Sequence, residues 1–252
     1  MQSNNIGPDK INVTAGYCKA CDETHTLGSH DAYSECIALM KILEKEQCMD
    51  FVLPEDLRQN EMRTEYLFGP ARGKMLGVMT ALTSEGERVV KYAFSGQYNG
   101  LWRIKGWVPP IVDGDAMARI SVDVETHIKE IGRKMEGYVP GDSYRTKLKH
   151  QRRDLSRQLM RDIHDLYLLR NFKGEKRAVS DVFLTEGVPT GTGDCCAPKL
   201  LQYAVLNELK PESIAEFYWG KENRSGSKKH GCFYSACAEK CQPILGYMLC
   251  GL

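Results

Sequence analysis

The sequence predicts an α/β fold that carries an inserted helical hairpin, and three observations support this prediction. Two apolar strands separated by a short polar loop occupy residues 74–96. A charged stretch with helical spacing follows over about 115–185, and residues 187–252 then alternate between helix, strand, loop and helix. We therefore expect one α/β domain over 71–252 with the helical insertion inside it, preceded by a polar tail and a helical segment over 1–70.

The helical segment near the N-terminus is predicted from its apolar spacing. Tyr33, Ile37 and Met40 recur at the three-to-four residue interval of one helix face within residues 29–47. Ser29 stands where an N-cap is expected, because its hydroxyl can accept a hydrogen bond from the free N–H groups of the first turn.

A β-hairpin is predicted from two apolar segments, 74–82 and 88–96, joined by a polar loop that contains Gly86. Both segments are apolar enough to lie inside a sheet. The aromatic segment 100–108 is expected to add a third strand, which a Pro-Pro pair at 109–110 ends.

The insertion is predicted to be a basic helical hairpin. Residues 144–177 contain eleven Lys or Arg and four acidic residues, so their net charge is +7 (eleven minus four). Leucines at helical spacing give the segment an apolar stripe, and the Gly- and Pro-containing stretch 137–141 separates it from the preceding helix. The residues expected to contact an RNA backbone are Arg145, Lys147, Lys149, Arg152, Arg153 and Arg157. The alternative is a solvated helix face, which charge runs usually form.

Overall composition excludes some classes of function. Lys plus Arg number 34 and Asp plus Glu number 33, so any nucleic-acid affinity must come from a local patch. No apolar run is long enough to span a membrane, and the polar start does not resemble a secretory signal. These features predict a cytoplasmic protein.

Ten cysteines in such a protein favour metal ligands, reactive thiols or small buried side chains over disulfides. Cys237 and Cys241 lie one helical turn apart, and Cys195 lies where a glycine-rich loop enters a predicted helix, which favours a thiolate. Three thiolates would bind one zinc ion and leave a fourth position open. The alternative is that these cysteines, like Cys36 and Cys48 and also Cys232 and Cys250, only fill the core.

A second metal site is predicted from the spacing of Cys18, Cys21, His25 and His30, which is close to that of a zinc knuckle. This site would be structural. The alternative is that these are loop residues of the polar tail.

The segments GTGDCCAPKLLQYA, IAEFYWG and HGCFYSACAEKCQPILGYML resemble the module found ahead of the catalytic domain in some RluA-type bacterial pseudouridine synthases. The resemblance covers about residues 70–252, and its most specific part is 191–201. The synthase signature His-Arg-Leu-Asp is absent from the chain. The resemblance therefore implies a role linked to RNA modification, with a separate synthase as a partner, and not pseudouridine synthesis by this chain.

That module is similar in layout to the zinc deaminases, so the resemblance implies a deaminase-like three-layer α/β domain. In deaminases, zinc activates a water molecule and a glutamate shuttles protons during attack on a nucleobase. Carried over, the first zinc ligand would be Cys195 or its neighbour Cys196, and the other two would be Cys237 and Cys241. The adjacency of the first two leaves the choice between them open.

The sequence departs from the deaminase pattern in two places. Ala197 stands two residues after Cys195, where the proton-shuttling glutamate is expected, and three residues rather than two separate the later cysteines. A proton-transfer group would then come from elsewhere. Asp194 is the first candidate, followed by Glu216 and Glu239.

Three functions follow as hypotheses. The first is a zinc-dependent hydrolytic deaminase of a nucleobase. The second is a noncatalytic RNA-binding accessory module, in which zinc is a staple. The third is a cysteine hydrolase, in which Cys195 and His230 form a thiolate–imidazolium pair that Asp194 orients.

Overall fold

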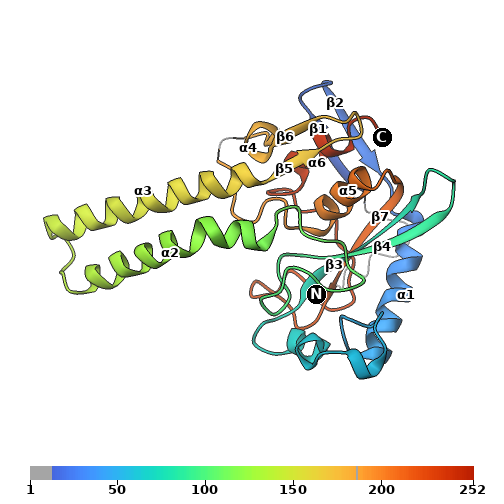
Figure 1. Ribbon diagram of the computed structural model, residues 1–252, viewed down its shortest axis with the longest axis horizontal. Helices are drawn as coiled ribbons and strands as arrows, with labels where there is room; N and C mark the ends of the chain where they lie inside the picture. Colours follow the sequence, from blue (N-terminus) through green and yellow to red (C-terminus); the bar gives the residue numbers. More distant parts are fainter. Residues whose placement is uncertain (1–12, 186) are drawn as a thin grey trace.

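A three-stranded antiparallel sheet forms the centre of the protein. The computed structural model describes residues 13–185 and 187–252 and shows a mixed α/β protein with small antiparallel sheets, as predicted (Figure 1). The central sheet has the order β4-β3-β7, with β3 at Lys74–Leu82, β4 at Arg88–Phe94 and β7 at Lys210–Trp219. The β3–β4 hairpin confirms the predicted strand pair.

The two faces of the central sheet pack against different helices. Along β3, Leu76 and Val78 belong to a core shared with α1 (His30–Glu46), whereas Met79 belongs to a core shared with α5 (Cys196–Leu206). Side chains of a strand point alternately to opposite faces, which explains this division. The sheet therefore lies between a helix on each side, as Figure 1 shows.

Helix α1 begins and ends close to the predicted positions. Ser29 is its N-cap residue, but the Ser29 side chain makes no capping hydrogen bond. The helix ends at Gln47, which takes a left-handed conformation with φ of 51°, and whose N–H donates to the Leu43 carbonyl. This pattern is typical of a left-handed helix C-cap.

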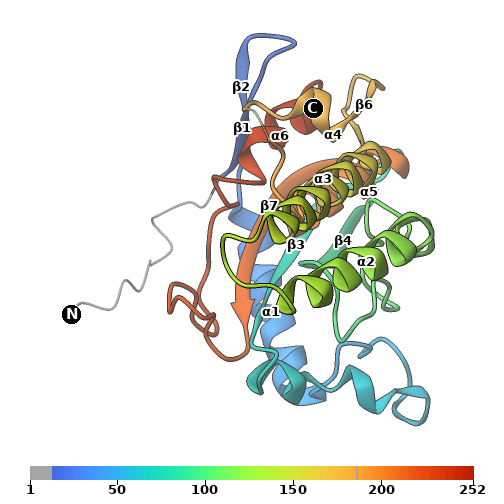
Figure 2. The same cartoon turned by 90° about the vertical axis from the view of Figure 1, so that its left-hand side faces the viewer.

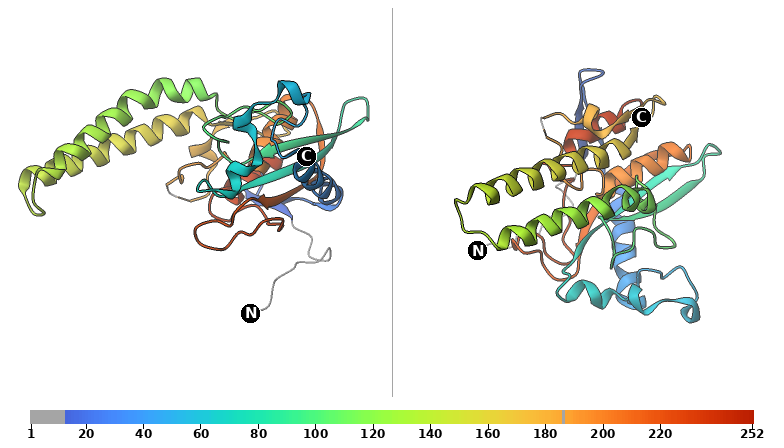
Figure 3. Two further views of the ribbon diagram at one scale, coloured as in Figure 1. Left: turned by 90° about the horizontal axis from the view of Figure 1, so that it is seen from below. Right: turned by 60° about the vertical axis from the view of Figure 1, so that its left-hand side comes forward.

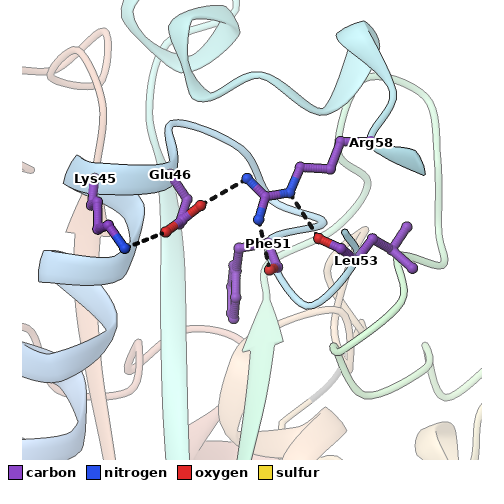
Figure 4. Close-up of polar contacts among 5 residues, drawn as sticks. All are labelled: Lys45, Glu46, Phe51, Leu53 and Arg58. Carbon is purple, nitrogen blue, oxygen red and sulfur yellow. Dashed lines mark hydrogen bonds and ion pairs between the residues drawn. The ribbon is translucent and has the colours of Figure 1, made fainter. Parts of the chain in front are cut away.

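Residues 47–68 return the chain from α1 to the sheet through three short 3₁₀ helices, η1 (Glu55–Leu57), η2 (Asn60–Met62) and η3 (Thr64–Phe68). Arg58 holds this segment against the end of α1. Its guanidinium donates to the Glu46 carboxylate and to two backbone carbonyls of residues 51–53 (Figure 4).

The aromatic segment 100–108 is not the third strand that the sequence predicts. It is a loop that forms two isolated bridges, one between Leu101 and Tyr98 and one between Trp107 and Tyr92 of β4. Trp107 is buried, and its indole N–H donates to the Met49 carbonyl at 2.6 Å. Trp107 therefore fills the core under α1 from a loop.

The N-terminal segment predicted as a polar tail contains a second hairpin, formed by β1 (Thr14–Cys18) and β2 (Glu23–Leu27). This hairpin packs on α6 (Gln242–Leu249) near the C-terminus, and all three are adjacent in Figure 1. Helix α6 is shorter than the sequence predicts, because the chain before it is a turn that ends at Cys241.

The predicted helical hairpin is present and projects from the body as a long arm (Figures 2 and 3). It comprises α2 (Gly114–Glu136) and α3 (Ser143–Leu166). The carboxylates of Asp113 and Asp142 cap the two helices by accepting backbone N–H groups of the first turns. An apolar seam joins the helices along the arm, formed by Ile131, Met135, Leu148 and Leu155.

Helix α3 ends at Leu166, so the later part of the predicted basic helical stretch has a different structure. Residues 168–178 form a small hairpin, β5 (Leu168–Arg170) and β6 (Lys176–Ala178), which the short helix α4 (Val179–Val182) follows.

No helix among the described residues is both long enough and apolar enough to cross a membrane.

Candidate metal centre

The first candidate site lies where α5 and α6 begin. Cys195 is the N-cap residue of α5, Cys241 is the N-cap residue of α6, and Cys237 lies in the turn before α6. The loop that delivers Cys195 requires glycine, because Gly193 has φ of 93° and a Cβ there would lie 2.8 Å from the Tyr167 ring. Segments about forty residues apart therefore meet at one point.

The three sulfur atoms form a compact group. Each lies within 4.8 Å of the others, and the Sγ atoms of Cys237 and Cys241 are 3.4 Å apart. Zn–S bonds of about 2.3 Å at tetrahedral angles place neighbouring sulfurs roughly 3.8 Å apart. Cys241 is buried, whereas Cys195 and Cys237 are half-buried. The donor set therefore fits a zinc ion with three protein ligands.

Hydrogen bonds among the three thiols shift their pKa values in opposite directions. Hydrogen bonds from Cys195 and Cys241 lower the pKa of the Cys237 thiol to about 2. Hydrogen bonds to Cys195 and Cys237 raise the pKa of Cys241, and the bond to Cys237 raises the pKa of Cys195. Of the three thiols, Cys237 is therefore the one that loses its proton most readily.

The structure separates the two adjacent cysteines that the sequence left open. Cys196 points to the sheet, where its buried thiol donates to the Met75 carbonyl at 3.3 Å, and it is not a member of the metal-ligand group. Its close packing depends on Gly77 of β3, because a Cβ at that position would lie 2.5 Å from the Cys196 Cβ. Cys195 is therefore the candidate ligand.

Glu216 is the carboxylate on the sheet beneath the beginning of α5. It follows Ile214 by two residues on β7, so both side chains point to the α5 face. Only 6% of Glu216 is exposed, and its Oε1 accepts the Ala197 N–H at 2.9 Å. Burial raises its pKa to about 7, and the nearby Cys237 contributes to the increase.

Asp194, the first candidate for proton transfer from sequence, already has a partner. Its Oδ1 accepts the Tyr167 hydroxyl at 2.6 Å, and its pKa is raised by burial. Glu239 is exposed in the turn between Cys237 and Cys241. Of the three acidic candidates, only Glu216 bonds to the first turn of α5.

His230 lies beside β7. Its Nδ1 accepts the Gly220 N–H at 3.1 Å, and its ring packs against Trp219 and Phe68. Among the described residues, its contacts are with Gly220, Trp219 and Phe68 and not with Cys195. The packing lowers the pKa of His230 by desolvation.

Two lysines near the centre were not singled out from sequence. Lys199 of α5 is buried, and its Nζ donates to the carbonyls of Phe94 and Gly96, at 2.9 Å each. Lys228 is half-buried, and burial lowers its pKa against the opposing effect of Glu216 and the cysteine group. The Cys-Cys-Ala-Pro-Lys sequence places Lys199 one turn after Cys195, a spacing that could have identified it.

A second group of metal-ligand side chains differs from the predicted one. Cys18, Cys21 and His25 come together, as the sequence predicts, but the fourth member is Cys250. His30 is not in this group, because it lies at the exposed first turn of α1. Cys250, expected from its sequence context to fill the core, is buried and also belongs to this group.

The residues predicted to contact RNA all lie on α3. Arg145 is half-buried near the tip of the arm, and its Nε lies buried without a hydrogen-bond partner. The others, Lys147, Lys149, Arg152, Arg153 and Arg157, are exposed.

Comparisons of the chain with protein-family models, curated proteins and solved structures give no match. The resemblance to the module of RluA-type synthases therefore stays a prediction. A group of three cysteines that could hold a metal ion, beside a buried glutamate, is the feature from which a function can be argued.

Proposed function

We propose that the protein is a zinc-dependent hydrolytic deaminase of a nucleobase, with Cys195, Cys237 and Cys241 as zinc ligands and Glu216 as the proton-transfer residue. One observation carries this proposal. The Glu216 carboxylate bonds to the backbone N–H of Ala197, which is the residue that stands where deaminases carry their catalytic glutamate. Glu216 of β7 would therefore take the role of the glutamate that α5 lacks.

The arrangement of elements supports the same class. A hairpin, β3–β4, precedes α5, then β7, then α6, and the candidate ligands lie where the two helices begin. In the zinc deaminases that the chain resembles, a hairpin likewise precedes a helix that starts with the first ligand, and a second helix starts with a pair of cysteines. Glu216 lies outside the group of ligand atoms that could share one ion, as expected of a deaminase glutamate that is not a zinc ligand.

The proposed chemistry divides between the metal and the protein. Zinc bound by three thiolates leaves a position for water and lowers the pKa of that water. Glu216 would accept one proton of the attacking water as the C–O bond forms and donate it to the exocyclic amino nitrogen as the C–N bond breaks, so that ammonia leaves. The remaining hydroxyl proton would move to the neighbouring ring nitrogen, which leaves a carbonyl on the base. Its burial suits this role, because a carboxyl with a pKa of about 7 can both accept and donate a proton near neutral pH.

The test is ammonia release from nucleosides and single-stranded RNA by zinc-loaded protein. We expect Glu216→Gln to retain zinc and to lose activity by roughly 10²–10⁴-fold, the usual contribution of a general acid–base. Asp194→Asn is the matched comparison, because that carboxylate also lies near Cys195 but bonds to Tyr167. Full activity of Glu216→Gln, or of Cys237→Ser, would refute the proposal.

A second candidate function is the noncatalytic RNA-binding module, and the projecting arm is the observation that favours it. The basic side chains of α3 are exposed along an arm that extends away from the body (Figure 3). Lys and Arg in such positions bind phosphates without sequence specificity. Changing Arg152, Arg153 and Arg157 together to Gln should weaken RNA binding and flatten its dependence on salt concentration. Unchanged affinity would remove this function from the arm.

A further inference from the structure

We infer that Cys18, Cys21, His25 and Cys250 bind a second zinc ion, a structural one, which ties the N-terminal hairpin to the end of α6. The four ligand atoms lie within 4.8 Å of one another. The Sγ atoms of Cys21 and Cys250 are 3.6 Å apart, close to the roughly 3.8 Å that tetrahedral zinc requires. The Cys21 Sγ also lies 2.9 Å from the His25 Nε2.

The local fold places three of these ligands on one hairpin. Cys18 is the last residue of β1, Cys21 lies in the turn, and His25 lies on β2, where it pairs with Gly16. Asp22 allows the tight turn by adopting a left-handed conformation with φ of 56°. The hairpin therefore supplies three of the four ligands that a tetrahedral zinc site needs.

The fourth ligand, Cys250, comes from the other end of the chain. Strand β1 and helix α6 approach so closely that a Cβ on Gly16 would lie 2.3 Å from the Gly246 nitrogen, and a Cβ on Gly246 would lie 2.2 Å from the Tyr17 backbone. Glycine at both positions therefore permits backbone-to-backbone packing. This contact brings Cys250, directly after α6, to the hairpin turn, although 229 residues separate it from Cys21.

The composition of this group differs from that of the first centre. It offers three thiols and one imidazole, and this Cys₃His set is a closed structural zinc site without a position for water. Cys18 and Cys250 are each only 1% exposed, so the ion would be shielded on two sides. Lys173 lies in hydrogen-bond contact with Cys250 and adds a positive charge beside the site. This cation offsets the net negative charge that three thiolates and one Zn²⁺ carry.

The second ion has a mechanical consequence for α6. That helix begins at Cys241, a ligand of the first centre, and is followed at its other end by Cys250, a ligand of the second. Residues 244–249 of α6 are buried between the two sites. Zinc at the second site would fix the position of α6 on the hairpin, and through it the position of Cys241.

The experiment is native mass spectrometry of the full chain purified without added metal. We expect two zinc ions in the parent protein, one in Cys250→Ser, one in Cys237→Ser and none in the double variant. Two controls are available: His30→Ala, which removes the histidine outside the group, and Cys232→Ser, which removes a half-buried cysteine outside both groups. Both should retain two ions.

Two results would overturn the inference. One is a parent protein with a single zinc that Cys237→Ser removes and Cys250→Ser does not. The other is a disulfide between Cys21 and Cys250, detected as a loss of two mass units and two alkylatable thiols in unreduced parent protein. If Cys250→Ser fails to fold, the parent protein and Cys237→Ser still decide the question: one zinc in Cys237→Ser supports the inference, and none overturns it.

Discussion

Replacing Glu216 by Gln should remove a pH dependence of stability that the structure assigns to this one carboxyl. The side chain is almost completely buried, and its pKa is raised from the ordinary 4.5 to about 7. The native state therefore binds a proton more tightly than the unfolded state does. Between pH 4.5 and about 7 the native state holds more protons, so its stability falls as the pH rises through that range.

The magnitude follows from the difference between the two pKa values. About 7 minus 4.5 is about 2.5, and each pKa unit corresponds to about 1.4 kcal/mol, so ionising Glu216 in the native state costs about 3 kcal/mol in total. Roughly 2.5 kcal/mol of this cost appears between pH 5 and pH 8. Gln has the same shape, stays neutral and can still accept the Ala197 N–H.

The assay is urea unfolding followed by tryptophan fluorescence at pH 5 and pH 8, with parent protein and Glu216→Gln side by side. The variant should gain about 2–3 kcal/mol over the parent between pH 5 and pH 8. Glu239→Gln, which changes an exposed glutamate, is the control and should run parallel to the parent. If the free energy of unfolding changes between pH 5 and pH 8 by the same amount in Glu216→Gln as in the parent protein, the reasoning is refuted.

Three further predictions concern packing around the centre. Gly77→Ala should destabilise the protein by about 1–3 kcal/mol and weaken zinc binding, because its Cβ would lie 2.5 Å from Cys196; urea unfolding and a zinc titration measure both. Gly132→Ala, where the nearest atom lies 3.7 Å away, is its control and should be neutral or stabilising by up to about 1 kcal/mol. Trp107→Phe should cost about 1–3 kcal/mol in thermal unfolding, since it leaves the Met49 carbonyl unpaired; an unchanged Tm would contradict this. Gly193→Ala should lower zinc affinity in a chelator competition, because a left-handed residue against Tyr167 must move the loop; equal affinity would show that the loop adapts.

Local periodicity made much of the fold predictable. Helix α1, the β3–β4 hairpin, α5 and β7 all carry their apolar spacing within a single segment. The β1–β2 hairpin does not, since its five-residue strands are short and polar and depend on packing against α6. The loop 100–108 was wrongly predicted as a strand because Trp107 is buried through a distant partner, Met49, and not through strand pairing.

The candidate centre was predictable in its ligand types and less so in its geometry. Cys237 and Cys241 lie four positions apart in the sequence, so a single turn of the chain brings their sulfur atoms together. The choice of Cys195 over Cys196 depends on the rotation of α5 over Gly77, which no local pattern encodes. The role of Cys250 depends on a contact between opposite ends of the chain.

The central claim is that a metal ion bound by Cys195 lies beside Glu216, and the zinc stoichiometry of two neighbouring variants tests it most directly. Cys195→Ser and Cys196→Ser differ by one position, and only the first removes a proposed ligand. Elemental mass spectrometry should find one zinc fewer per chain in Cys195→Ser than in the parent protein, and an unchanged amount in Cys196→Ser. Equal zinc in the parent and Cys195→Ser would contradict the account.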